Sequence, residues 1–187
     1  EERFDRAVAQ NYRAVVLHNE GKPGPLREAV RRYLDADRLF AALEADFPNE
    51  PQVLYRRAWN AYYGYAAAAN ADDNVRAEQF LNQGRDAAAR LLTIEEADHS
   101  LVTFAERMRE AQAEFLSNSG RHREAIVLQE AIVADRAKKI GSDRKTITLS
   151  EVAYGKAILG TIYRKAGDRE KACRSWVEAE ELLAELK

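Results

Sequence analysis

Six short stretches rich in Gly, Pro, Asn, Asp and Ser interrupt this 187-residue chain at intervals, and they constrain its fold more than any single motif does. They lie at 21–25, 47–51, 69–74, 118–120, 141–146 and 166–168. Between them, apolar residues recur at three- and four-residue spacing, which is the period of an α-helix. We therefore predict eight helices, over 2–18, 26–46, 51–68, 74–92, 98–118, 121–139, 146–166 and 169–186. The short turns between them predict antiparallel helical hairpins.

Composition supports an all-α chain. Only four prolines occur, and Ala, Leu, Glu and Arg, which are good helix formers, are abundant. Val, Ile and Thr do not gather into the alternating runs that are typical of strands. We expect a single repeat domain over 1–187, with hairpins at 2–46, 51–92, 98–139 and 146–186. Since the chain begins at Glu1 without a methionine, it can be a fragment of a longer protein.

A small residue recurs at one position in each hairpin. The alanines 36, 77, 125 and 172 are 41, 48 and 47 residues apart, and four residues after them stand Phe40, Leu81, Gln129 and Trp176. Two helices approach closely only where the side chain between them is short. The larger residue covers the next turn of the same face. A repeated hairpin that cannot bury its apolar face alone must stack on its neighbours, so the pattern predicts a solenoid.

The last hairpin resembles the tetratricopeptide repeat family. The residues that carry the resemblance are Leu159, Gly160, Tyr163, Gly167, Asp168, Ala172, Trp176 and Ala179. By this resemblance, Gly160 and Ala172 are the small residues where the two helices cross, and Gly167 is the turn. Partial matches occur in the other hairpins, at Ala36, Phe40, Leu43 and Pro48, at Ala58 and Ala61, and at Ala113, Leu116, Gly120 and Ala125.

The resemblance implies a right-handed α-α superhelix, a tetratricopeptide-like solenoid of about four antiparallel hairpins and eight helices. The spacing of 41–48 residues exceeds the family's period of about 34, which leaves a HEAT- or armadillo-like solenoid open. Residues 124–163 also resemble the longer repeats of kinesin light chains. Similar arrays lie beside kinase or DNA-binding domains in bacterial signalling proteins.

Charge and motif content argue against several classes of function. The net charge is −2, so neither nucleic acid nor an anionic membrane is an expected partner, and no apolar run is long enough to span a membrane. The single cysteine, Cys173, fits a reducing, cytoplasmic compartment and is expected to pack on its helix. His18, His99 and His122 do not form a metal-binding pattern. We therefore expect no metal, no cofactor and no enzymatic activity.

One basic cluster stands near the end of the helix predicted at 121–139. It consists of Arg136, Lys138, Lys139, Arg144 and Lys145. Positive side chains at a helix C-terminus complement the helix dipole, so we expect the positive end of this helix, followed by a solvated loop. Contact with a phosphate or an acidic partner is the alternative.

The segment AWNAYYGYAAAAN, which starts at Ala58, makes the helix 51–68 unusually aromatic. At 100° per residue, Tyr65 falls on a packing face, and Arg56, Arg57 and Asn60 fall on an arc away from the apolar residues. Tyr55, Trp59 and Tyr62 allow two interpretations, packing between repeats or contact with a partner. Tyrosine and tryptophan are common anchors at interfaces, and a buried tyrosine hydroxyl needs a partner.

Tetratricopeptide arrays bind a peptide or helix in a concave groove lined by the first helix of each hairpin. By this resemblance, the groove residues would be Tyr55, Trp59, Tyr62, Arg107, Glu110, Glu114, Tyr154, Thr161 and Arg164. The expected function is a non-enzymatic protein-interaction module that binds a protein or peptide partner. The alternative is a regulatory or sensor domain of a larger signalling protein, with a small ligand or an intramolecular segment in the groove. The chain could also form a homodimer.

Overall fold

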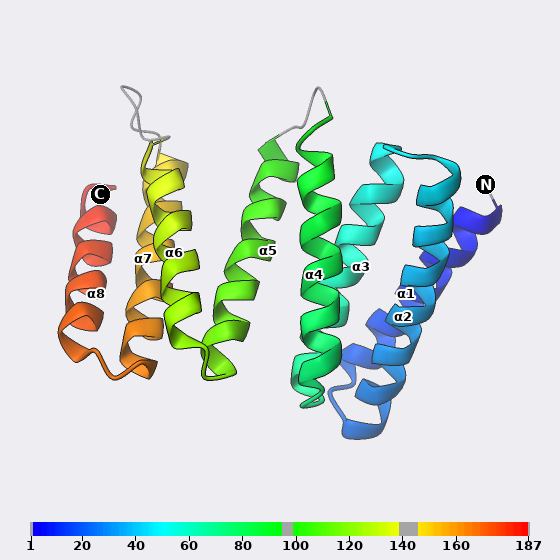
Figure 1. The fold of residues 1–187 in the computed structure, drawn as a ribbon, viewed down its shortest axis with the longest axis horizontal. Coiled ribbons are helices and arrows are strands. Elements are labelled where there is room, and N and C mark those ends of the chain that lie inside the picture. The colour runs from blue at the N-terminus through cyan, green and yellow to red at the C-terminus, as the bar shows by residue number, and fades with distance from the viewer. Residues whose placement is uncertain (1, 95–98, 139–145, 187) are drawn as a thin grey trace. The chain divides into compact units, whose positions relative to one another are not determined.

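A computed structural model describes residues 2–94, 99–138 and 146–186. Within these residues the chain forms eight α-helices and no strand, so the predicted all-α class and number of helices are confirmed (Figure 1). The helices are α1 (Glu2–Asn19), α2 (Pro23–Asp46), α3 (Pro51–Asn70), α4 (Asn74–Leu91), α5 (His99–Asn118), α6 (His122–Lys138), α7 (Thr146–Lys165) and α8 (Arg169–Ala184).

Where the predicted end of a helix lies among the described residues, the observed end differs from it by at most three residues. The largest difference is at α2, which begins at Pro23 rather than at residue 26. A proline suits the first turn of a helix because its fixed φ is already helical and the missing N–H would have no partner there. The segment GKPGP therefore starts the helix instead of forming a longer turn. The predicted end residues 98 and 139 lie outside the described residues.

Local chemistry explains how the hairpins turn. Gly120 and Gly167 have φ angles of 79° and 86°, which favour glycine because it has no Cβ to clash with the backbone. The predicted turn at Gly167 is thereby confirmed. The carboxylates of Asp73 and Asp168 accept hydrogen bonds of 3.0 and 3.1 Å from backbone N–H groups in the first turns of α4 and α8. These N-caps satisfy donors that the helix itself leaves unpaired.

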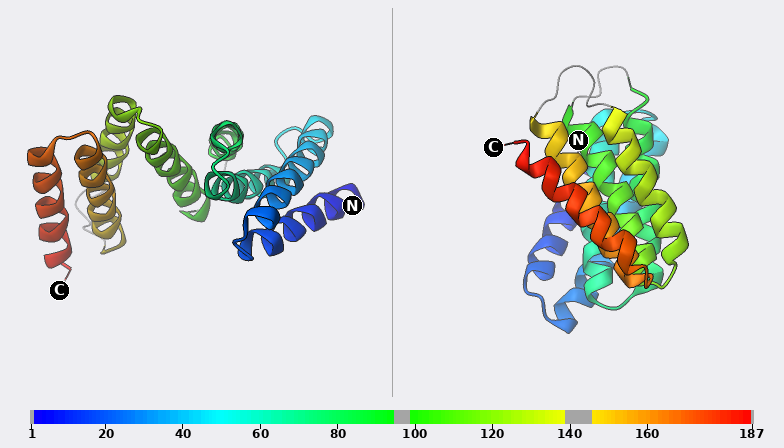
Figure 2. Two further views of the ribbon diagram at one scale, coloured as in Figure 1. Left: turned by 90° about the horizontal axis from the view of Figure 1, so that it is seen from below. Right: turned by 90° about the vertical axis from the view of Figure 1, so that its left-hand side faces the viewer.

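The chain divides into two compact units, one ending at Met108 and the other beginning at Arg109. In the first unit α1 packs on α2 and also meets α3, while α2 packs on α3 and α3 on α4 (Figure 2). In the second unit α7 packs on both α6 and α8 (Figure 2). The division falls within α5, so the single domain over 1–187 and its superhelical hand stay predictions.

Each unit has its own apolar core. One cluster of the first unit joins α1, α2 and α3 through Ala7, Ala36, Phe40, Leu43 and Val53. In the second unit, one cluster joins the end of α5 to α6 and α7, and another joins α7 to α8. These cores hold successive helices at fixed separations, which positions the surfaces described below.

The recurring alanines are all buried. Ala36, Ala77 and Ala125 are completely buried, and Ala172 is 1% exposed. At Gly160 two helices approach closely, because a Cβ on this residue would lie 2.5 Å from Nε1 of Trp176 on α8. The packing of α7 against α8 therefore requires a small residue at this position.

Candidate functional site

The aromatic residues of α3 form a cluster around Trp59 in the first unit. The Trp59 ring lies 4.4 Å from that of Phe104 on α5, centroid to centroid, and stacks on Tyr63 at 5.6 Å. Tyr62 and Tyr55 complete the cluster at 5.8 and 6.2 Å, with edge-to-face geometry. These separations are those of favourable aromatic pairs. The rings therefore pack against one another.

Only part of this aromatic cluster faces solvent. Tyr55, Trp59 and Tyr62 are half-buried, Tyr63 is exposed, and Phe104 is buried. Phe104 lies against the rings of Tyr55, Trp59 and Tyr62 and so joins them into one cluster. The predicted groove residues Tyr55, Trp59 and Tyr62 thus come together, but mainly as packing residues. Arg107 of the same unit is exposed on α5.

A pocket of about 390 Å³ lies between α5 and α7 in the second unit. Its lining includes three predicted groove residues, Glu114, Tyr154 and Thr161. The residues that the sequence analysis did not single out are Ser117, Asn118, Ala157, Ile158, Ile162 and Lys165. The lining residues on α7 follow one another at helical spacing and so share one face, which is a signal that could have identified them from the sequence.

The polar groups of this pocket differ in how well they are paired. The Lys165 ammonium donates a hydrogen bond to Oδ1 of Asn118, and the Thr161 hydroxyl donates to the Ala157 carbonyl at 3.1 Å. The Ser117 hydroxyl is buried and has no hydrogen-bond partner among the described residues. A buried hydroxyl without a partner is costly, and in a native structure it asks for an explanation.

The electrostatic environment of Glu114 is unfavourable for its charged form. Partial desolvation raises the pKa of this carboxyl above its ordinary value, even though much of the side chain reaches solvent. The charge of Glu110, one turn away, raises the pKa further, and Lys165 opposes both effects. The pocket therefore holds a carboxylate that a positive ligand group would stabilise.

Glu110, a predicted groove residue, lies in the interior of the second unit. It is 6% exposed and accepts a hydrogen bond from the Arg136 guanidinium, which also donates to the Glu151 carbonyl at 3.2 Å. Arg136 is itself buried, although it lies in the basic last turn of α6, where the sequence placed the positive end of this helix. Burial of either charge alone would be costly, which explains their pairing. Of the basic cluster, Lys139, Arg144 and Lys145 lie outside the described residues.

The remaining predicted groove residue, Arg164, serves the contact between α7 and α8. Its guanidinium lies 5.9 Å from the ring centroid of Trp176, within the range of a cation–π interaction. The Trp176 indole N–H donates to the Ala157 carbonyl at 3.2 Å. Arg164 is exposed but is already engaged with its own hairpin.

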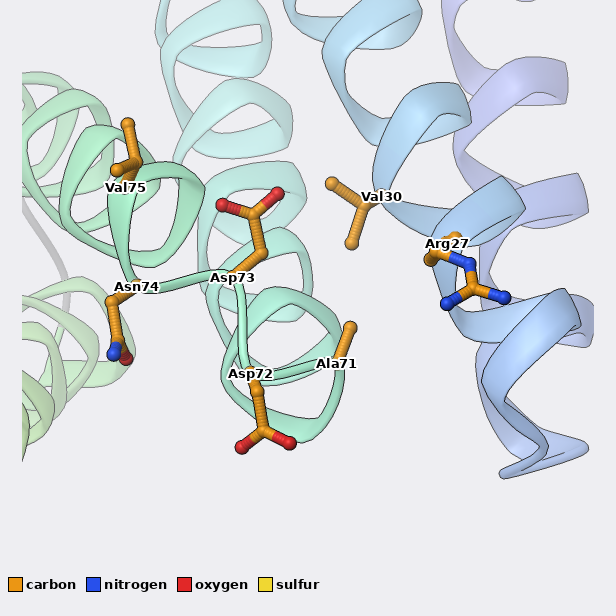
Figure 3. A pocket seen from close by; sticks show the side chains of 7 residues that line it. All are labelled: Arg27, Val30, Ala71, Asp72, Asp73, Asn74 and Val75. Carbon is orange, nitrogen blue, oxygen red and sulfur yellow. The ribbon is translucent and has the colours of Figure 1, made fainter.

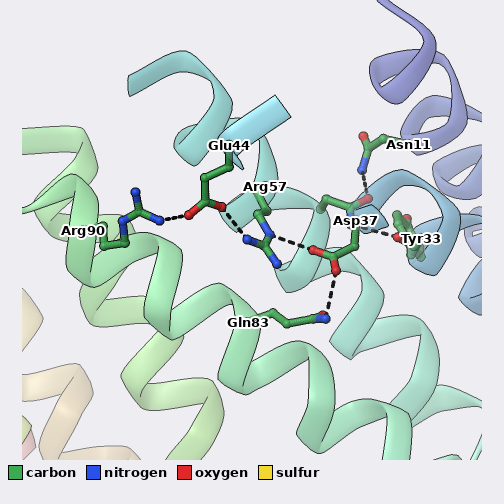
Figure 4. Close-up of polar contacts among 8 residues, drawn as sticks. Asn11, Tyr33, Asp37, Glu44, Arg57, Gln83 and Arg90 are labelled. Atoms are coloured by element: carbon green, nitrogen blue, oxygen red, sulfur yellow. Dashed lines mark hydrogen bonds and ion pairs between the residues drawn. The ribbon is translucent and has the colours of Figure 1, made fainter. Parts of the chain in front are cut away.

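A network of charged and amide side chains crosses the interior of the first unit (Figure 4). Asp37 of α2 accepts hydrogen bonds of 2.9 Å from Arg57 of α3 and from Gln83 of α4. Arg57 also pairs with Glu44, which pairs in turn with Arg90 (Figure 4). The placement of Arg57 on an outward arc is therefore wrong.

Like Arg57, Asn60 of α3 was expected on the arc away from the apolar residues, and it lies inward instead. It is completely buried, donates to the Tyr33 carbonyl at 3.0 Å and accepts from Asn11 at 2.9 Å. The mean periodicity of α3 did not reveal this position, because a polar side chain counts toward the outer face whatever it bonds to. Its partners come from α1 and α2, which only the tertiary structure brings together.

A second pocket, of about 550 Å³, lies where α3 turns into α4 (Figure 3). Arg27 and Val30 of α2 line one side, and the turn residues 71–73 with the first two residues of α4 line the other. The Asp73 carboxylate is already used as the N-cap of α4. Within the described residues, no group of three or more His, Cys, Asp or Glu side chains could hold a metal ion.

Two further features bear on function. Among the helices of the described segments, none combines the length and the apolar character that crossing a membrane requires. Cys173 is exposed, which corrects the expectation that it packs on its helix.

No protein-family model matches the chain, and a search of curated proteins gives no significant match. Among solved structures, the chain is similar to one named DHF58 filament, with a TM-score of 0.54, 19% identity and coverage of 100% of this chain and 96% of that one. It is also similar to a chain from Podosopora anserina, described as a kinesin light chain with nearly identical TPR-like repeats. That match has a TM-score of 0.43, 15% identity and 98% coverage of both chains. The fold comparison rests on the first structure, and at 19% identity it shows a shared fold alone.

Proposed function

We propose that this chain is a non-enzymatic helical-repeat module that binds a segment of another protein at the pocket between α5 and α7. The observation that carries this proposal is the pocket itself, where Glu114, Tyr154 and Thr161 lie together with the unpaired Ser117 hydroxyl. Its volume of about 390 Å³ falls within the range of ligand sites, near the lower end. A space of this size suits one or two side chains of a longer segment.

The exposed aromatic ring favours a protein partner. Tyr154 is 60% exposed, although large apolar residues on the same helix, such as Ile158 and Ile162, are buried. Tyrosine supplies a large contact area at a small cost in conformational entropy and is enriched among the residues that dominate binding energy. The apolar floor and polar rim of the pocket match the usual anatomy of an interface.

The same residues favour binding over catalysis. Covalent catalysis requires a nucleophile held within hydrogen-bonding distance of a base. In this pocket the Ser117 hydroxyl has no hydrogen-bond partner among the described residues. The pocket therefore offers anchors for a ligand but no activated nucleophile.

The test is a comparison of two tyrosine variants in a partner-capture experiment. The immobilised chain captures proteins from a lysate of its source organism, and mass spectrometry quantifies them. We expect Tyr154→Ala to reduce capture of the specific partner at least about tenfold, which corresponds to about 1.4 kcal/mol at an interface anchor. Tyr12→Ala is the matched control, because Tyr12 is 57% exposed on α1 of the first unit.

Circular dichroism must show that both variants retain the helical content of the parent chain. If Tyr154→Ala leaves capture unchanged, or if Tyr12→Ala reduces it equally, the pocket between α5 and α7 is not the binding site.

A further inference from the structure

We infer that the pocket between α5 and α7 receives a lysine or arginine side chain of the bound segment, with the Glu114 carboxylate as its counter-ion. This inference rests on the proposed function and adds the chemistry of the partner. Three features of the pocket carry it: the state of its charges, the form of its floor, and the hydrogen-bonding groups on α5.

The charges around the pocket leave one carboxylate without a partner. Glu110 is ion-paired with Arg136 inside the second unit, and the Lys165 ammonium hydrogen-bonds to Asn118. Glu114 makes no hydrogen bond or ion pair with the described residues. An anionic ligand group would meet repulsion from this carboxylate, and a neutral apolar group would desolvate it further without compensation. A cation with N–H donors compensates both effects.

The floor of the pocket suits the stem of a long basic side chain. Ala157, Ile158 and Ile162 of α7 are apolar, and Tyr154 stands one turn before them. Lysine and arginine bury their methylene stems against apolar surface and keep the charged head group in a polar environment. The Tyr154 ring adds a surface on which a guanidinium or ammonium group can lie. One side chain can therefore contact the apolar floor and the carboxylate together.

The acceptors on α5 are spaced for more than one hydrogen bond. Glu114 and Ser117 are three residues apart on the same helix face, and both line the pocket. A guanidinium carries five N–H donors in a planar fork, so it could reach both acceptors, whereas an ammonium would bind the carboxylate as a point charge. Lys165, one turn further along α7 from Thr161, also lines the pocket, and its positive charge disfavours a second cation there.

The experiment selects ligands without assuming a partner. A library of displayed random 12-residue peptides is selected against the full chain, and peptides that still bind Tyr154→Ala are removed. We expect the remaining peptides to share one lysine or arginine. Replacing that residue by methionine is expected to weaken binding to the parent chain at least tenfold in isothermal titration.

A double-mutant cycle then locates the counter-ion. Glu114→Gln is expected to weaken the selected peptide about as much as the methionine replacement does, and the two changes together should cost little more than either alone. Glu180→Gln is the matched control, since Glu180 is exposed on α8 of the same unit. It is expected to leave the affinity unchanged.

The outcomes separate the two proposals. Peptides that depend on Tyr154 but share no basic residue, or that bind Glu114→Gln as well as the parent, overturn the basic-side-chain inference and leave the proposed function intact. If no selected peptide depends on Tyr154, the proposed function fails, and the inference fails with it.

Discussion

Gly160 is a residue where the absence of a side chain decides the packing of a hairpin. A Cβ at this position would lie 2.5 and 2.6 Å from Nε1 and Cδ1 of Trp176. The indole ring is held there by its hydrogen bond to the Ala157 carbonyl and by the Arg164 guanidinium over its face. The ring therefore cannot move aside without the loss of these contacts.

We expect Gly160→Ala to lower the free energy of unfolding by about 1–3 kcal/mol, as overpacking usually does. In an unstrained helix the same change would raise stability by about 0.5–1 kcal/mol. Urea titration followed by circular dichroism measures the effect. In a Trp176→Ala background the substitution is expected to be neutral or stabilising. An equal loss in both backgrounds would show that the ring is not the cause.

The raised pKa of Glu114 allows a second prediction, on how the stability of the chain depends on pH. Because the folded chain holds the proton of this carboxyl more tightly than the unfolded chain does, ionisation of Glu114 disfavours folding as the pH rises through its pKa. We therefore expect Glu114→Gln to be more stable than the parent at pH 7. This advantage should shrink as the pH falls through the raised pKa of Glu114 and should be lost below the ordinary pKa of a glutamate. Urea titrations at pH 7 and pH 4 measure it, and a greater advantage at pH 4 would contradict the assignment.

At the scale of elements, the network around Arg57 fixes how α2, α3 and α4 sit on one another. Asp37 and Glu44 come from α2, Gln83 and Arg90 from α4, and Arg57 joins them from α3 (Figure 4). Their carboxylates are largely buried, so each depends on the hydrogen bonds that it accepts. A network of this kind favours one register of the three helices over shifted ones, because a shift would leave buried charges unpaired.

Arg57→Ala is expected to destabilise the chain by about 2–4 kcal/mol, because it leaves Asp37 and Glu44 with fewer partners in a buried environment. Arg38→Ala is the matched control, since Arg38 is exposed and pairs with Asp35 on the surface of α2. A surface ion pair contributes about 0–1 kcal/mol, so its loss should be small. Similar losses in the two variants, measured by thermal or urea unfolding, would show that the network is not stabilising.

For the whole molecule, helix positions and candidate contacts could be predicted to different degrees. The eight helices followed from turn residues and from a period of three to four, because both depend on neighbours in the chain. Three residues that line the pocket, Glu114, Tyr154 and Thr161, were among the groove residues that the family resemblance implied, and their role in binding stays a prediction. Ser117, Asn118 and Lys165 were missed, because their proximity depends on how α5 and α7 pack across the intervening helix.

The all-α class, the positions of the helices and the small residue at Gly160 could be predicted from the sequence, since each follows from local backbone preferences or from the size of a side chain. Which polar residues lie inside depends instead on packing between residues far apart in the chain. Arg57, Asn60 and Arg136 are polar residues of kinds usually found at the surface, yet they are buried or partly buried with partners 13 to 49 residues away. Burial of a polar group is favourable only when a partner meets it, and stacking of the hairpins supplies that partner.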